Sequence, residues 1–326
     1  MAHTGGRTGW ASERLGKKYG KLTLGEWISV ALTFLAVVLV FCLFFIRRQT
    51  LEYSMEHTFP VRSPEFFGSA MALSHPVPIA GNKIELLQNG DEYFPSMLEA
   101  IRKAQRSVNF ASYIMKSDGV GHQFRDALIE RARAGVEVRV LLDGIGSGWS
   151  LDNSDVRMMR DGGCKFAYYH PVHSWRMDRT NRRSHRRVLV VDGKVGFTGG
   201  AAFQDKWSGH AQDEHHWRDT QVRMEGPIVS ALQAAFQAHW VKTYHEALTG
   251  ADQFPALAPA GDLDAQIVES VSFSSAPIPM VQAVTFAAAE KRIWIANPYC
   301  TPTDDQVALL VKAVVWRESR FSTTKT

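Results

Sequence analysis

His185 and Arg187 stand two residues apart, just before the apolar run 188–191, and their types suit phosphodiester chemistry. Side chains alternate between the two faces of a β-strand, so both residues project from the same face of an extended segment. The imidazole can attack phosphorus as a nucleophile. The guanidinium can bind the non-bridging phosphate oxygens through two parallel hydrogen bonds. The pair therefore indicates a site that acts on a phosphodiester.

A wider pattern surrounds this pair. Asp192 follows the apolar run, and Gly199 and Gly200 end the next segment. Together these residues resemble the His-x-Lys-x4-Asp-x6-Gly-Gly/Ser-x-Asn motif of the phospholipase D superfamily, and the likeness is closest to bacterial cardiolipin synthases. The resemblance extends from about residue 84 to about residue 311.

Two positions depart from that motif. Arg187 stands where the family has lysine, and Ala202 stands where it has asparagine. Arginine keeps the positive charge but is not equivalent to lysine at a tight phosphate site. Alanine lacks the hydrogen-bond donor that the family directs at the phosphate. The resemblance therefore predicts a recognisable but altered active site.

The resemblance implies a mechanism. His185 is the expected nucleophile, which becomes a phosphohistidine, and Arg187 is the expected phosphate clamp. Asp192 would orient the imidazole or stabilise its charged form, while capping of the Asp-Gly turn remains an alternative role. A second histidine, on the other lobe of the family's fold, protonates the leaving alkoxide. No metal or other cofactor is implied, because cations from both lobes neutralise the developing charge.

The composition describes a globular protein. Hydrophobic residues make up 45% of the 326 positions and charged residues 21%, and the net charge is +4, which excludes a disordered chain and an overall polycation. Six arginines still predict a local positive surface for an anionic head group: Arg176, Arg179, Arg182, Arg183, Arg186 and Arg187. The three cysteines are too widely spaced for a metal motif or a disulfide framework. The histidines at 170, 173, 210, 215 and 216 are expected to be surface residues rather than metal ligands.

Residues 27–46 form an uncharged run rich in Val, Leu and Phe. At 1.5 Å per residue this run spans a hydrocarbon core of about 30 Å, which predicts a single-pass helix in the cell membrane rather than a signal peptide. Trp27 marks one interface, and Arg47 and Arg48 mark the other. The basic residues before the run favour an N-terminus inside the cell. The family includes proteins with a cytoplasmic catalytic region, so the side of the globular part stays open.

Strands that alternate with helices predict an α/β fold: a phospholipase D-like α/β sandwich lobe plus an incomplete second lobe, preceded by one transmembrane helix. Helices are predicted over 93–105, 121–134 and 155–160, and strands over 107–114, 136–142 and 164–169. A weaker repeat follows, with a helix over 280–289 and a strand over 292–296. No second His-x-Lys/Arg-x4-Asp motif occurs, so we expect the second lobe to be truncated at its C-terminal side.

These expectations divide the chain into six segments. They are a basic tail (1–26), the transmembrane helix (27–46), a connector (47–82), the first lobe with the motif (83–250), a linker (251–265) and the truncated second lobe (266–326).

Three functions remain open. The favoured one is a membrane-anchored phosphatidyltransferase of the cardiolipin synthase type, acting on phosphatidylglycerol or a similar phospholipid and impaired because the second motif is absent. A homodimer would supply a second His185. The first alternative is a phosphodiesterase or nuclease of the same superfamily, although the membrane helix disfavours nucleic acid as a partner. The second is a non-catalytic remnant that binds anionic lipid.

Overall fold

The computed structural model describes residues 23–45, 63, 66, 68–69, 77–171, 183–270, 277–297 and 299–322. The chain separates into two compact units, residues 1–54 and 55–326. Each unit is described by itself below.

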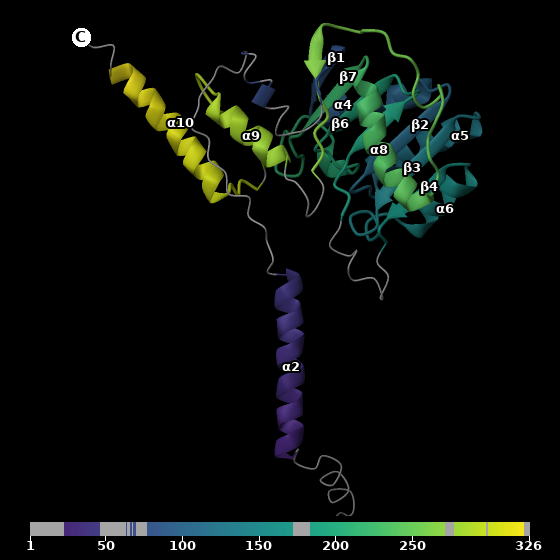
Figure 1. Ribbon diagram of the computed structural model, residues 1–326. Helices are drawn as coiled ribbons and strands as arrows, with labels where there is room; N and C mark the ends of the chain where they lie inside the picture. Colours follow the sequence, from purple (N-terminus) through teal and green to yellow (C-terminus); the bar gives the residue numbers. More distant parts are fainter. Residues whose placement is uncertain are drawn as a thin grey trace, which may run out of the picture. The chain divides into compact units, whose positions relative to one another are not determined.

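Within its described residues, 23–45, the first unit forms helix α2 (Leu24–Phe45), which confirms the helix predicted from the apolar run. Thr23 caps it, because its backbone N–H donates to Glu26 Oε2 (2.7 Å) and Glu26 N–H donates back to Thr23 Oγ1 (3.4 Å). All described side chains from Thr23 to Phe41 are exposed. In the part of the chain that the structure describes, α2 is the one helix long and apolar enough to cross a membrane (Figure 1).

The second unit is built on an eight-stranded mixed sheet with strand order β4-β3-β2-β5-β6-β7-β1-β8. The strands are β1 (Ile79–Gln88), β2 (Ser107–Ser112), β3 (Glu137–Asp143), β4 (Lys165–Tyr169), β5 (Val188–Val191), β6 (Val195–Gly199), β7 (Thr220–Glu225) and β8 (Leu263–Ala265). Strands β2, β3 and β4 are parallel to one another, and the other neighbours pair antiparallel. The α/β class predicted from the sequence is confirmed.

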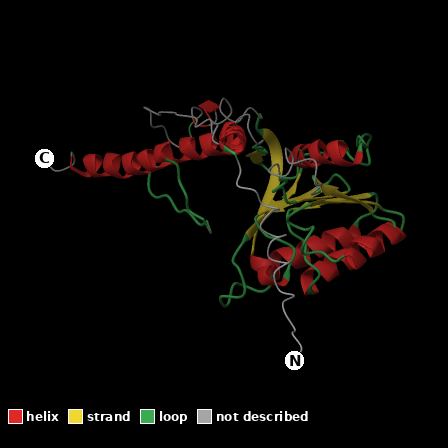
Figure 2. Cartoon of the chain, turned by 90° about the horizontal axis from the view of Figure 1, so that it is seen from below, coloured by secondary structure: helices red, strands yellow, loops and turns green. Residues whose placement is uncertain are grey.

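Helices cover both faces of this sheet (Figure 2). Helices α4 (Asn89–Lys103), α5 (Gly119–Arg133) and α6 (Asn153–Asp161) bury apolar side chains in the core on one face, and α8 (Ile228–Tyr244) does so on the other. Strand β5 shows the alternation clearly: Leu189 and Val191 belong to the first core, whereas Val188 and Val190 belong to the second. The central strands are buried on both sides, which explains their near-continuous apolar sequences.

The helices and strands predicted between residues 93 and 169 form within a few residues of their expected bounds. Two boundaries differ. Strand β1 begins at Ile79, inside the expected connector, and β8 lies at the end of the expected linker, where it pairs with β1. Backbone pairing with a distant strand, rather than local sequence, makes these segments part of the sheet.

The strand expected over Arg292–Ala296 does not form, and that prediction was wrong. Helix α9 (Pro277–Ala287) forms close to its predicted place and packs against α10 (Asp304–Ser322), but residues 292–297 between them are irregular. Trp294 is 83% exposed there. A strand needs a partner for its backbone groups, and no described residue pairs with this segment.

Candidate active site

The segment 183–187 leads into β5 without belonging to the sheet, so side-chain hydrogen bonds hold it in place. Asp143, at the end of strand β3, which is two positions from β5 in the sheet, is fully buried. Its Oδ2 accepts the Ser184 backbone N–H (2.8 Å), and its Oδ1 accepts the backbone N–H of Ile145 (2.9 Å) and faces Arg183 Nη1 at 3.4 Å. This carboxylate therefore fixes the backbone immediately before His185.

His185 and Arg187 lie together, as the sequence predicts. Arg187 Nη1 is 2.9 Å from His185 Nδ1, and Nη2 is 3.3 Å from Nε2. The imidazole also packs against the Tyr113 ring, with 4.7 Å between ring centres. His185 stays exposed to solvent, whereas Arg187 is buried. An accessible imidazole thus rests on an inward-facing cation.

This geometry sets the protonation of His185. Arginine carries only donors, and the shorter of the two contacts assigns the lone pair of the neutral ring to Nδ1, which accepts from Nη1; the proton is then on Nε2, and the 3.3 Å contact with Nη2 is not a hydrogen bond. Partial withdrawal from water lowers the pKa of His185, the charge of Arg187 lowers it further, and the charge of Asp143 opposes both effects. The ring is therefore neutral at pH 7. The lone pair that would attack phosphorus is engaged by Arg187.

Arg187 is held from several sides. Its Nε donates to the Ala201 carbonyl (3.0 Å), and its own carbonyl accepts the Thr198 hydroxyl (2.8 Å). Burial lowers the pKa of the guanidinium, and the negative charge of Asp219 opposes that effect. The group stays protonated, as arginine does in proteins. The result is a fixed positive charge directly beneath the imidazole.

Sequence reasoning missed three residues near this pair, Tyr113, Asp143 and Asp219. Tyr113 follows β2, Asp143 is the last residue of β3 and Asp219 precedes β7, all at the same end of the sheet, so only the tertiary fold brings them together. Asp219 had a signal, because the stretch Trp217-Arg218-Asp219-Thr220 lies within the part of the chain that resembles the family. Ala202, in place of the family's asparagine, is fully buried and brings no polar side chain to the site.

The structure does not bring Asp192 to His185. The two residues flank β5 at opposite ends, and a strand advances about 3.3 Å per residue. Asp192 Oδ1 accepts the backbone N–H groups of Arg106 (2.7 Å) and Ser107 (2.9 Å), and Oδ2 accepts that of Gln105 (3.0 Å). This carboxylate anchors the start of β2, which is neither the orienting role nor the capping of its own Asp-Gly turn.

Replacing Asp192 with alanine should lower the free energy of unfolding by about 2–4 kcal/mol, because three backbone N–H groups lose their acceptor. Denaturant titration of the full chain in detergent would measure this. Asp252→Ala is the matched control, since Asp252 forms an exposed ion pair with Arg106 and should cost less than about 1 kcal/mol. If Asp192→Ala left the free energy of unfolding unchanged but abolished activity, Asp192 would have to act by orienting His185.

His239, on α8, also escaped the sequence analysis. Its Nδ1 lies 2.9 Å from Ser184 Oγ, and its ring stacks on Tyr169 with 4.4 Å between centres. Burial and the nearby positive charge of Arg186 lower the pKa of His239 to about 3. The ring is therefore neutral under ordinary conditions, and it secures the residue just before His185.

The depressed pKa of His239 predicts a loss of stability in acid. An unfolded histidine binds its proton near pH 6.5, whereas folded His239 does not until about pH 3. The free energy of unfolding should therefore fall as pH drops below 6.5, by at most about 1.4 kcal/mol per unit from this group. His239→Gln, measured by unfolding between pH 7 and pH 5, should show a shallower slope. An unchanged slope would contradict the buried neutral state.

The arginine cluster is only partly available to a ligand. Arg183 contacts Asp143, and Arg186 is paired with Glu269 and donates to the Ala235 carbonyl. Arg176, Arg179, Arg182 and His173 lie outside the described residues. Among the described residues, no group of three potential ligands is arranged to hold a metal ion.

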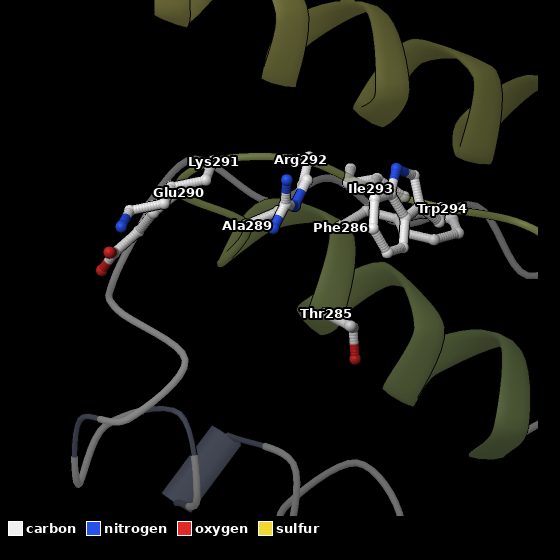
Figure 3. A pocket seen from close by; sticks show the side chains of 8 residues that line it. All are labelled: Thr285, Phe286, Ala289, Glu290, Lys291, Arg292, Ile293 and Trp294. Carbon is white, nitrogen blue, oxygen red and sulfur yellow. The ribbon is translucent and has the colours of Figure 1, made fainter.

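A hollow of about 460 Å³ lies elsewhere, beyond the end of α9, and is lined by residues 285, 286 and 289–294 (Figure 3). Arg292 lies over the Trp294 ring, 4.7 Å from its centre. Glu290 is the one carboxylate of the lining, which includes no histidine. The hollow therefore offers neither the nucleophile nor the clamp found at His185.

The fold and this pair can be compared with known proteins. The family model for the cardiolipin synthase, phospholipase D-like domain matches residues 97–240. Cardiolipin synthase 1 of Bacillus anthracis is 35% identical over 236 residues, which cover 69% of this chain and 46% of that protein. Cardiolipin synthase A of Pseudomonas syringae pv. syringae is 33% identical over 273 residues, with 80% and 55% covered. The chain spans about half the length of these curated relatives.

A solved phosphatidylserine synthase of Haemophilus influenzae has a similar fold, with a TM-score of 0.51 and 13% identity over 78% of this chain and 64% of that one. The chain belongs to the phospholipase D superfamily, an enzyme family of phosphatidyltransferases and related phosphodiesterases. Within it, the chain carries a phospholipase D-like domain of the cardiolipin synthase type.

Proposed function

We propose that this protein transfers phosphatidyl groups between alcohols, with His185 as the nucleophile and Arg187 as the phosphate clamp. The observation that carries the proposal is the contact between an exposed, neutral imidazole and a buried guanidinium, 2.9 Å apart. A neutral imidazole has a lone pair for phosphorus, and a fixed guanidinium matches two phosphate oxygens. The relatives named above are cardiolipin synthases, which supports a phospholipid such as phosphatidylglycerol as the substrate.

The arrangement suggests how the substrate frees its own nucleophile. In the resting site Arg187 binds the Nδ1 lone pair of His185. Phosphodiester oxygens compete for the same N–H groups, and their negative charge makes them the stronger acceptors. Once phosphate oxygens have replaced the imidazole as the acceptors of the Arg187 N–H groups, the unprotonated ring nitrogen attacks phosphorus. The bond from phosphorus to the leaving alcohol breaks, and that alcohol takes a proton from a general acid.

The acceptor step reverses the first. An alcohol gives its proton to the same group, now acting as a base, and attacks the phosphohistidine, which releases His185. The sequence holds one copy of the motif, so we propose that the second histidine comes from another copy of the chain in a homodimer. A single chain would then catalyse the transfer slowly, which agrees with the departures from the family motif at Arg187 and Ala202.

The membrane helix belongs to the same proposal. Helix α2 is long and apolar enough to span a bilayer and would keep the protein at its lipid substrate, with the N-terminus in the cytoplasm. Access of a protease to the basic tail in sealed vesicles of known orientation would test the side.

The test of the function is turnover of phosphatidylglycerol by the reconstituted full chain. The proposal expects cardiolipin and free glycerol in equal amounts. A second candidate, a non-catalytic protein that binds anionic lipid, is favoured by the engaged lone pair of His185 and by the buried Ala202. That candidate predicts binding to anionic vesicles without either product at any protein concentration.

A further inference from the structure

Trp149 is 82% exposed, although indole is costly to leave in water. It lies on the turn that follows β3, and that turn is not loose. Ser147 Oγ donates to the Tyr113 carbonyl (2.9 Å) and accepts the Met115 N–H (3.0 Å), while Ser150 Oγ donates to the Met115 carbonyl (3.0 Å). The fold therefore presents this side chain outward on a fixed backbone.

Trp217 repeats the arrangement before β7. It is 45% exposed, and its ring meets that of the buried Trp207 with 4.6 Å between centres. Its backbone N–H donates to the Lys206 carbonyl (2.7 Å), and Lys206 Nζ lies 5.5 Å from its ring centre. A second tryptophan is thus held half-exposed with a cation against it.

The sheet puts both tryptophans on the edge that carries His185. Strand β3 runs in the same direction as β2, whereas β5 and β7 run in the opposite direction. The end of β3 and the starts of β5 and β7 therefore lie along the same edge of the sheet, where these strand ends meet. Strands β3 and β7 are four positions apart in the sheet, which is about 19 Å at the usual strand spacing. Residue 185 precedes the strand midway between them. Trp149 and Trp217 therefore flank the site.

The chemistry of this edge favours a bilayer interface as its partner. Tryptophan has an apolar body and a polar N–H, and it concentrates where hydrocarbon meets head groups. Lys206 and Arg218 are exposed beside Trp217 and can meet lipid phosphates, whereas Asp205 accepts two backbone N–H groups. Asp213 and Glu214 are exposed nearby and offset these positive charges. The exposed indoles, rather than a net positive charge, are therefore what favours a bilayer at this edge.

We infer that Trp149 and Trp217 insert into the head-group region of a phospholipid bilayer on either side of His185. Such insertion sets the depth and tilt of the site so that a lipid phosphate reaches the imidazole without leaving the membrane. The inference rests on the proposed function only for the identity of the lipid that enters. The contact itself concerns the bilayer surface.

The full chain, reconstituted in phosphatidylglycerol vesicles with bromine-labelled phosphatidylcholine, tests the contact without any turnover. Bromine quenches indoles that enter the bilayer. Trp149→Ala and Trp217→Ala should each remove part of the quenched fluorescence. Trp294→Ala is the matched control, since Trp294 is 83% exposed but lies on the segment after α9. Equal quenching in wild type and both edge variants would overturn the inference. A protein partner that covered Trp149 and Trp217 and kept lipid away from them would overturn it as well.

Turnover separates this inference from the proposed function. The double variant should lose about tenfold or more in turnover of vesicle phosphatidylglycerol. Loss of the binding of even one indole to the bilayer is enough to lower membrane affinity about tenfold. It should keep wild-type turnover of a soluble diester, bis(4-nitrophenyl) phosphate. Equal losses on both substrates would refute a membrane role. If the wild-type protein turned over neither substrate, the proposed function would fail, while quenching would still decide the surface.

Discussion

Replacing His185 with alanine should abolish phosphatidyl transfer, lowering turnover by about 10³-fold or more, because no other group then forms the covalent intermediate. The assay is cardiolipin formation from phosphatidylglycerol by the reconstituted chain. His210→Ala is the matched control: His210 is an exposed histidine, 72% accessible, that faces Asp91 rather than the clamp. It should keep full activity.

The pH dependence of the wild-type protein gives a second view of the same residue. Because its surroundings lower the pKa of His185, the ring should stay neutral below pH 6.5, and turnover should decline only at more acid pH. An acid limb above pH 7 would contradict the environment described for this imidazole. Loss of activity in His210→Ala equal to that in His185→Ala would also contradict it.

Replacing Arg187 should separate two roles of this side chain. Arg187→Ala should weaken the apparent affinity for a phosphodiester by about 100-fold, since a charge-assisted fork of two hydrogen bonds is lost. Arg187→Lys should recover part of that affinity but not the contact with Nδ1, because lysine has one compact ammonium group. His185 should then react faster with diethyl pyrocarbonate, which acylates a free imidazole lone pair.

Peptide mass spectrometry would measure that labelling rate without any substrate. Arg157→Lys, an exchange at an exposed arginine on α6, is the matched control and should label at the wild-type rate. If Arg187→Lys labelled no faster than this control, the guanidinium would not be masking His185 in the resting protein.

Much of the fold was predictable because local patterns and the sheet agree. The apolar runs in β2, β3 and β5 are buried on both faces, so their sequences indicate central strands without reference to neighbours. Prediction failed where a strand forms only by pairing with a segment that is far away in the sequence. Strand β8 pairs with β1 across more than 170 residues, and the segment 292–296 has strand-like residues but no partner among the described strands.

The site divides in the same way. His185 and Arg187 were identifiable because two residues on one extended segment must face the same side. Asp192 suggested two roles, and the backbone N–H groups that donate to it lie 85 or more residues away, at the N-terminal end of β2, which no local pattern reveals. Asp143, His239 and Asp219 come from three other elements. These three side chains lie near His185 only because the folded sheet brings their segments together, so their contribution is visible only in the structure.

The most direct measurement of the central claim is to trap the covalent intermediate. The reconstituted chain would be mixed with phosphatidylglycerol, quenched at alkaline pH, where phosphohistidine survives, and mapped by peptide mass spectrometry. The proposal predicts a phosphatidyl adduct on His185, absent from His185→Ala and present in His210→Ala. Turnover of phosphatidylglycerol with the adduct on any other residue, or with none under conditions that preserve it, would contradict His185 as the nucleophile.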